Sequence, residues 1–324
     1  MPLDDSQSLH KPRAIAHNVR MELRHINVIG APTDVGASVR GASMGPDALR
    51  VAGLVEALRR QGFEVTDQGN LFGPPNPGQP AQGGLRHLEE VVAWNREVYD
   101  AVDATLGRGE FPLLMGGDHG LAIGSISAIA WHCRRQGRHL RVIWLDAHTD
   151  VNTEAISPSG NLHGMPVSCL LGHGPASLVG WSGERMALGP GDIDFIGIRS
   201  VDADEREAIR RLGLQVFDMR HIDEHGMRNT MTEALHDVDD NTHLHVSFDL
   251  DCLDPADAPG VGTGVRGGPT YREMQLCMEM IADTGRLCSL DVVEINPALD
   301  VRNRTAELAV DFIQSLFGAS TLAR

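Results

Sequence analysis

Three ionisable residues at alternate positions, Asp146, His148 and Asp150, directly follow an apolar stretch over 140–145. Alternate side chains on an extended backbone point to the same side, so these three groups are expected to converge. Buried together, they would repel one another and lose solvation unless a cation lay between them. The pattern therefore favours a metal site over the alternative, a polar loop with helix-capping aspartates.

Two more apolar stretches end in residues of the same kind. The segment 111–115 runs into two glycines, an aspartate and His119, and the segment 244–248 runs into Asp249 and Asp251. Taken alone, His119 fits a hydrogen-bonded structural histidine as well as a ligand. Two aspartates after a strand also resemble the start of a haloacid-dehalogenase-type phosphatase, but that alternative explains neither of the other two motifs.

Together, the three motifs supply four aspartates and two histidines as candidate ligands. Carboxylate oxygens with imidazole and no thiolate favour Mn²⁺ over a structural zinc site, and six ligands suit two ions better than one. Two ions that share a water lower its pKa, which makes hydroxide available near neutral pH. The motifs therefore predict a hydrolase. Its expected metal ligands are His119, Asp146, His148, Asp150, Asp249 and Asp251.

The overall composition argues against several other functions. A formal net charge of −16 provides no basic surface for nucleic acid or an anionic membrane, and suits a small cationic substrate. No stretch has the length and apolarity of a membrane span or of a leader segment. The five cysteines include no Cys-X-X-Cys pair, so we expect buried free thiols in a cytoplasmic protein.

The elements that position these residues alternate along the chain. Strands are expected at 25–30, 63–65, 111–115, 140–145, 194–198, 214–217, 244–248 and 287–293. Helices are expected at 44–61, 86–106, 121–136, 203–212, 271–283 and 306–317. This alternation predicts an α/β fold with three layers, αβα, around a mostly parallel sheet whose strand ends carry the site. Residues 1–20 are expected to be a disordered extension, and residues 21–324 a single domain.

Three motifs in this order resemble the signature motifs of the ureohydrolases, the family of arginases and agmatinases. They are Gly-Gly-Asp-His at 116–119, Asp-Ala-His-Thr-Asp at 146–150 and Ser-Phe-Asp-Leu-Asp-Cys-Leu-Asp-Pro at 247–255. The resemblance begins at 29–32, continues through 40–50 and ends near 294–297, so it covers nearly the whole chain. It implies an arginase-like fold, two Mn²⁺ ions, and a homotrimer or homohexamer.

The resemblance also implies how the six ligands and the reaction are arranged. A metal-bridging hydroxide would attack the guanidinium carbon of L-arginine, and the products would be L-ornithine and urea. Two ligands would bridge both ions and the other four would be divided between the ions. In this chain the bridging residues are Asp146 and Asp249, the residues of one ion are His119 and Asp150, and those of the other are His148 and Asp251.

Further roles are implied for residues outside the metal site. Glu294 matches the carboxylate that pairs with the guanidinium, and His163 matches a proton shuttle, so with Asp150 they are the predicted catalytic residues. Asn152 and Ser159 match contacts of the α-carboxylate. Side-chain amide and hydroxyl donors suit a carboxylate, and agmatine, which lacks that group, would leave them unpaired.

The α-amino end of the substrate is implied to contact Asp202, because an aspartate suits an ammonium group. Two positions depart from the family pattern there. Ser200 stands where some members have aspartate, and Gly264 stands where proline is usual, which weakens Thr263 as a predicted substrate contact. The alternatives are an agmatinase or another guanidino-acid ureohydrolase, a catalytically silent relative with a regulatory role, and a two-metal phosphatase, for which no Arg/Lys cluster adjoins the motifs.

Overall fold

Eight strands form one sheet in the structure, a computed structural model that describes residues 25–322. All neighbouring strands are parallel, where the sequence predicted a mostly parallel sheet. In spatial order the strands are β2 (Val65–Asn70), β1 (Ile26–Ala31), β3 (Phe111–Gly116), β8 (Leu287–Val293), β7 (Thr242–Asp249), β4 (His139–Leu145), β5 (Ile193–Ile198) and β6 (Gln215–Asp218).

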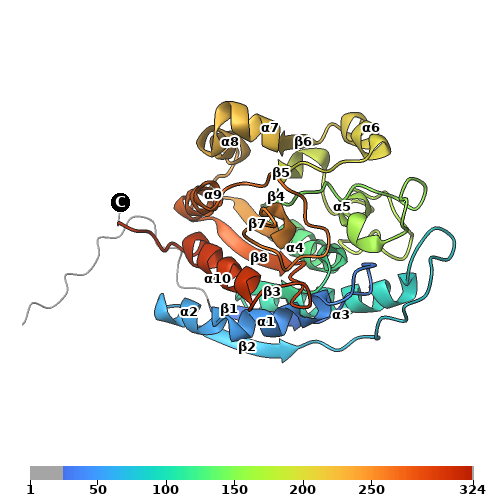
Figure 1. Cartoon of the computed structure of the whole chain (residues 1–324), viewed down its shortest axis with the longest axis horizontal. Helices are drawn as coiled ribbons and strands as arrows, with labels where there is room; N and C mark the ends of the chain where they lie inside the picture. The colour runs from blue at the N-terminus through green and yellow to red at the C-terminus, as the bar shows by residue number, and fades with distance from the viewer. Residues whose placement is uncertain (1–24, 323–324) are drawn as a thin grey trace, which may run out of the picture.

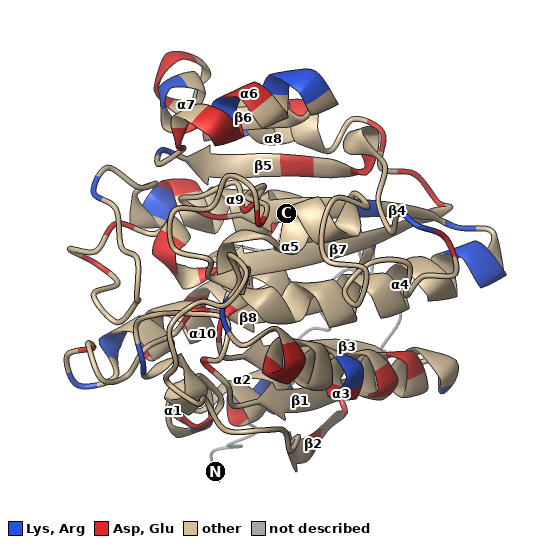
Figure 2. Ribbon diagram, turned by 90° about the vertical axis from the view of Figure 1, so that its right-hand side faces the viewer, with Lys and Arg blue, Asp and Glu red and all other residues tan. Residues whose placement is uncertain are grey.

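Continuous apolar runs form the strands because both faces of the sheet are covered. In β3, Leu113 and Met115 pack into the core on one face, and Leu114 packs into the core on the other. Since successive side chains of a strand point to opposite faces, such a run fills both cores. Figure 2 shows the Lys, Arg, Asp and Glu residues mainly on outer helices and loops, with the strands mostly uncharged.

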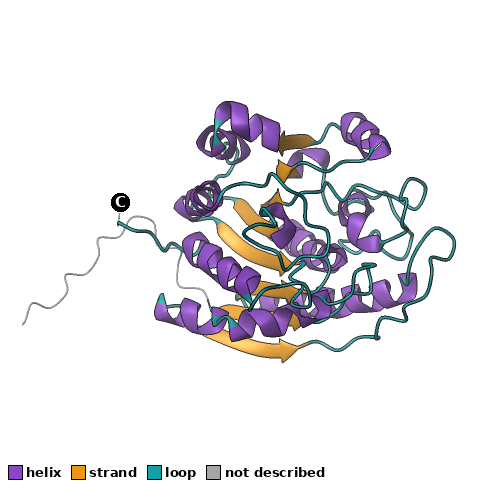
Figure 3. Ribbon diagram, viewed as in Figure 1, coloured by secondary structure: helices purple, strands orange, loops and turns teal. Residues whose placement is uncertain are grey.

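Helices cover both faces and complete the three layers (Figure 3). On one face lie α1 (Gly45–Val51), α2 (Leu54–Arg60), α7 (Met219–His225), α8 (Met227–Ala234), α9 (Tyr271–Asp283) and α10 (Arg304–Leu316). On the other lie α3 (Leu88–Gly107), α4 (Ala122–Gln136), α5 (Pro166–Leu170) and α6 (Ala203–Leu212). Figure 1 shows α9 and α10 to one side of the sheet and α4 and α5 to the other. The predicted αβα fold is confirmed.

Several predicted boundaries were wrong, for identifiable reasons. The strand expected at 63–65 runs over Val65–Asn70 at the sheet edge, where the residues after Val65 are polar apart from Gly69 and are at least partly exposed. The helix expected at 44–61 is two helices, because Gly53 adopts a left-handed φ of 80° between them. The short helices α5, α7 and α8 were not predicted, since five to eight residues show little periodicity.

Further predictions from the sequence concern the cysteines, membrane spans and the domain boundaries. All five cysteines are buried and outside any disulfide, as predicted. Within residues 25–322, no helix has the length and apolarity needed to cross a membrane. The predicted disordered extension at 1–20 lies outside the described residues, and the single domain over 21–324 stays a prediction.

The four central strands determine where the predicted site residues meet. Strands β3, β8, β7 and β4 are consecutive neighbours, and because they are parallel their carboxyl ends reach the same edge of the sheet. His119 lies shortly after β3, Glu294 directly follows β8, Asp249 ends β7 and Asp146 directly follows β4. Ligands of open α/β sheets bind at this edge, so the fold assembles the predicted site where such sites are expected.

Candidate metal centre and substrate cleft

Two groups of side chains at this edge could each hold a metal ion. The first cluster is His119, Asp146 and Asp249, and the second cluster is Asp146, His148 and Asp251. Within each cluster the ligand atoms lie within 4.8 Å of one another. Asp146 belongs to both clusters, with Oδ2 toward His119 and Oδ1 toward His148. A shared carboxylate is the arrangement that bridging two ions requires.

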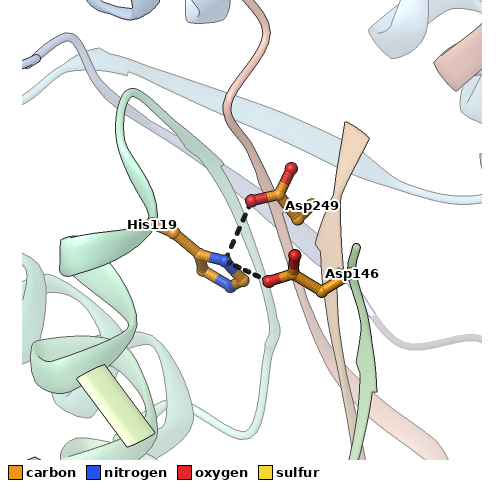
Figure 4. Close-up of side chains that lie close together, drawn as sticks. All are labelled: His119, Asp146 and Asp249. Carbon is orange, nitrogen blue, oxygen red and sulfur yellow. Dashed lines mark ion pairs between the residues drawn. The ribbon is translucent and has the colours of Figure 1, made fainter. Parts of the chain in front are cut away.

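His119 is fixed in the first cluster by contacts around its ring. Its Nε2 lies 2.8 Å from Ser247 Oγ, and the ring stacks on Trp144 at 4.0 Å. Its Nδ1 lies 3.1 Å from a carboxylate oxygen of Asp146 and of Asp249 (Figure 4), yet it forms no aligned hydrogen bond. A buried nitrogen that faces carboxylates without such a partner can give its lone pair to a cation. The first cluster therefore fits a metal ion.

Asp150, the sixth predicted ligand, lies beside the first cluster. Its Oδ2 is 3.3 Å from His119 Nδ1. The residue has a φ of 51°, a left-handed conformation that costs about 1 kcal/mol outside glycine. Such conformations gather at functional sites, where the surrounding structure enforces them. The turn at Asp150 thus brings a third carboxylate to the same histidine nitrogen.

The second cluster is held together by backbone and side-chain donors. His148 Nδ1 lies 3.1 Å from Asp251 Oδ2 and 3.4 Å from Asp146 Oδ1. Asp251 Oδ1 accepts a hydrogen bond from the backbone of Ala147, and Oδ2 accepts one from Thr263 Oγ1 at 2.9 Å. Thr263, which the sequence predicted as a substrate contact, therefore orients a candidate ligand in this structure.

The electrostatics of the two clusters call for positive charge. Burial, followed by repulsion from neighbouring carboxylates, raises the pKa of Asp150 to about 7 and the pKa of Asp249 well above its usual range. Burial lowers the pKa of His148, but the carboxylates of Asp251 and Asp146 outweigh it and raise that pKa to about 12. Carboxylates buried this close together repel one another, and a bound cation would stabilise them.

Glu294 lies behind the first cluster and is engaged by two donors. Its Oε1 accepts a hydrogen bond from the His119 backbone at 2.8 Å and lies 2.9 Å from His163 Nδ1. Burial lowers the pKa of His163, but Glu294, with smaller contributions from Asp118 and Asp150, raises it to about 9. His163 is therefore a protonated group near neutral pH.

A cleft of about 290 Å³ opens above the two clusters. Nearly all predicted site residues line it, but the shared Asp146 and the buried Glu294 do not. The lining residues that the sequence predicted are His119, His148, Asp150, Asn152, Ser159, His163, Asp202, Asp249, Asp251 and Thr263. The lining residues to which it assigned no role are Ser157, Pro158, Asn161, Gly164, Ser200 and Glu205.

Glu205 is the most informative of the residues that were missed. Its Oε2 accepts a hydrogen bond from the backbone of Asp202, and its Oε1 accepts one from Thr149. This is the third-position glutamate of a capping box at the start of α6, a spacing that the sequence displays. Reading that spacing would have placed a buried carboxylate beside Asp202.

Comparison with known proteins identifies the family. A model of the arginase family matches residues 24–318. The chain belongs to the arginase family. It is 44% identical over 300 residues to an arginase of Brevibacillus brevis, covering 92% of this chain and 99% of that protein. It is 43% identical over 303 residues to an arginase of Brucella melitensis, covering 93% and 98%.

The structure of this chain also matches solved structures of arginases. The structure of the arginase from Bacillus caldovelox superposes with a TM-score of 0.86 at 42% identity, and the match covers 92% of this chain and all of that chain. The resemblance inferred from the three motifs is thereby confirmed. Family membership makes the protein an enzyme, a hydrolase with carboxylate and histidine groups able to bind metal.

Proposed function

We propose that this enzyme hydrolyses L-arginine to L-ornithine and urea and uses two Mn²⁺ ions. One observation carries the proposal: two clusters that share Asp146 lie at the floor of a cleft whose walls include Asn152, Ser159 and Asp202. The relatives named arginase, which are 43–44% identical to this chain over nearly their full length, support arginine as the substrate.

Manganese suits the donors of the two clusters. They offer carboxylate oxygen and imidazole nitrogen without a thiolate, the ligand set that favours Mn²⁺. Two ions held there would supply a water of lowered pKa as the nucleophile. The residues proposed to bind the ions are His119 and Asp150 for one, His148 and Asp251 for the other, and Asp146 and Asp249 for both.

Glu294 and His163 are the proposed partners of the reacting guanidinium group. The Glu294 carboxylate offers a negative charge to the guanidinium and holds His163 through Nδ1. Since Glu294 raises the pKa of His163, that ring carries a proton that it can deliver to the departing amine. Asp150, which lines the cleft beside His119, completes the proposed catalytic set.

The far end of the cleft suits the amino-acid end of arginine. The amide of Asn152 and the hydroxyl of Ser159 can donate to the α-carboxylate, and Asp202 can accept from the α-amino group. Ser200 lies in the same wall, so the negative charge there comes from Asp202 and the nearby Glu205. We assign α-amino recognition to Asp202.

Urea release from a panel of guanidino compounds tests this function. After loading with manganese, the enzyme is expected to act on arginine and at least about 100-fold less well on agmatine and guanidinobutyrate, because each lacks a group that the cleft pairs. Asp202→Asn should raise KM for arginine more than it lowers kcat. Urea release from agmatine but not arginine would establish an agmatinase, and release from none would establish a silent relative.

Metal removal should lower the thermal stability of the enzyme. The two clusters concentrate buried carboxylates, so the ions bind the folded chain and not the unfolded one. Free Mn²⁺ at 100 times the dissociation constant adds about 2.7 kcal/mol per site to the free energy of unfolding. Differential scanning fluorimetry with manganese and with a chelator measures the change. Equal melting temperatures would contradict metal binding at these clusters.

We also propose a cytoplasmic homotrimer or homohexamer. Five buried cysteines outside any disulfide support a reducing compartment, and the family resemblance supports the assembly. Sedimentation equilibrium gives the subunit number directly, and a mass of one chain would refute the assembly.

A further inference from the structure

The Arg199 side chain, just after β5, is directed at main-chain carbonyls of two other segments. Its guanidinium donates to five carbonyl oxygens, and no described carboxylate forms an ion pair with it. The bonds are Nε to Val265 at 3.0 Å, Nη1 to Gly197 at 3.0 Å and Cys252 at 2.9 Å, and Nη2 to Asp251 at 2.9 Å, Leu253 at 3.1 Å and Val265 at 2.7 Å.

These carbonyls belong to the segments that supply the second cluster. Three of them are consecutive, from Asp251 to Leu253, so they fix the backbone from which the Asp251 carboxylate projects. Val265 lies two residues after Thr263, whose hydroxyl donates to that carboxylate. The guanidinium therefore holds both the ligand and the residue that orients it.

The backbone of Arg199 bonds the chain between the remaining two members of the second cluster. Its N–H and that of Ser200 both donate to the carbonyl of Ala147, the residue between Asp146 and His148. One turn thus contacts the chain beside all three members of the second cluster. In the first cluster, His119 comes from the segment after β3. It is held by Ser247 and Glu294, and not by the turn at Arg199.

The approach of this turn to the second cluster leaves little free space. A Cβ atom added to Gly197 would lie 2.8 Å from Cys252 Sγ and 3.2 Å from the Asp146 carbonyl oxygen. Gly197 also has a φ of 92°, which disfavours any other residue. Close packing against the residues that follow β4 and β7 therefore fixes the position of this turn. The Arg199 side chain extends from a backbone that cannot shift.

Only arginine can make this set of contacts. Its planar guanidinium presents five N–H groups in a rigid fork, whereas a lysine ammonium has three donors at a single point. A positive charge this close to a metal centre and a cationic substrate is electrostatically unfavourable for binding either. The presence of an arginine at position 199 is therefore explained by the geometry of its donors and not by its charge.

We propose that Arg199 is a positioning residue that sets the geometry of the second cluster and hence the affinity of the second metal ion. The inference rests on the proposed two-manganese function. Arg199 belongs to neither cluster and does not line the cleft, so it would act through the backbone of Asp251 and the loop that carries Thr263. Loss of its fork should weaken the second ion and leave the first in place.

Manganese titration of Arg199→Lys, which keeps the charge and loses the fork, tests the proposal. Losing an outer residue that orients a ligand costs about 10- to 100-fold in affinity. Two-site calorimetry should show one of the two dissociation constants raised by that factor and the other unchanged. At sub-saturating manganese, the electron paramagnetic resonance signal of a coupled ion pair should give way to that of a single ion.

Arg134→Lys is the matched control. Arg134 donates to the carbonyls of Ser182, Met186 and Ala187, and none of these residues lines the cleft. A purely structural loss should lower the melting temperature of both variants and leave two tightly bound ions in each. Two ions bound to Arg199→Lys with wild-type affinities would overturn the proposal. A wild-type enzyme that binds no manganese would overturn the proposed function, and this inference with it.

Discussion

Replacing Asp146 with asparagine is expected to abolish both urea release and binding of the metal pair. Asp146 is the one residue present in both clusters, with one carboxylate oxygen directed at each histidine. An asparagine has a single carbonyl oxygen and no charge, so it cannot serve both ions. Since losing an outer orienting residue already costs 10- to 100-fold, a shared ligand should cost about a thousandfold or more in kcat/KM.

The decisive measurements for Asp146→Asn are manganese per chain after gel filtration and kcat/KM at saturating manganese. Asp291→Asn is the control, because Asp291 is also buried on a central strand but accepts a hydrogen bond from Ser125 and belongs to neither cluster. The control should retain two ions. An Asp146→Asn enzyme that keeps two ions and wild-type turnover would disprove the bridging role.

The positions of the candidate ligands could be predicted because they follow from local sequence. An apolar run identifies a buried strand, and parallel strands bring their carboxyl ends to one edge. His119, Asp146 and Asp249 each lie at or just after such an end, so the first cluster follows from recognising three strands. The sequence could not predict the contacts of individual atoms, such as which oxygen of Asp146 faces which histidine.

The residues that support the ligands were harder to predict, since their partners are remote in sequence. Ser247 bonds His119 across 128 positions, and Arg199 reaches Asp251 across 52. No local pattern links such pairs. Ser247 did carry a weak signal, because it lies two residues before Asp249 on the same face of β7. Arg199 carried none, since an arginine after a strand is usually a solvated one.

The edge strand β2 shows the limit of hydrophobic patterning for the fold. Apolar runs mark strands that are covered on both faces, but β2 has only one neighbour in the sheet and contains Asp67, Gln68 and Asn70. Asp67 accepts hydrogen bonds from Arg50, so polar side chains of this strand are satisfied by pairing rather than by burial in a core. Charge pairing between separate elements leaves no periodicity to detect.

Two carboxylates of the site, Asp150 and Glu294, have left-handed backbones. Of the described residues other than glycine, three more share this conformation, and none belongs to either cluster: His87 directly precedes α3, and Arg302 and Asn303 directly precede α10. The strain at Asp150 and Glu294 is expected where side chains must be turned toward one point against local preference. Asp150 lines the cleft beside His119, and Glu294 contacts His119 and His163, so both left-handed turns direct a carboxylate toward the site.

Replacing Glu294 with glutamine should have the second-largest effect, a loss of about 100-fold or more in kcat/KM. The substitution removes the charge proposed to pair with the guanidinium and changes the group that holds His163 Nδ1. It should also change the pH profile. In the wild type, Glu294 is the main cause that raises the pKa of His163 to about 9, so activity that needs protonated His163 is lost as pH rises through that value.

Without the Glu294 charge, the main cause that raises the pKa of His163 is gone and burial still lowers it, so the alkaline limb of kcat should move to lower pH. A double-mutant cycle with His163→Asn separates the two roles of Glu294. If Glu294 acted only by holding His163, adding Glu294→Gln to His163→Asn would cost nothing further. A further loss is expected, because the charge facing the guanidinium disappears as well.

An unshifted alkaline limb in Glu294→Gln would show that His163 does not supply the proton, because the pKa of His163 must fall when the carboxylate 2.9 Å away is lost.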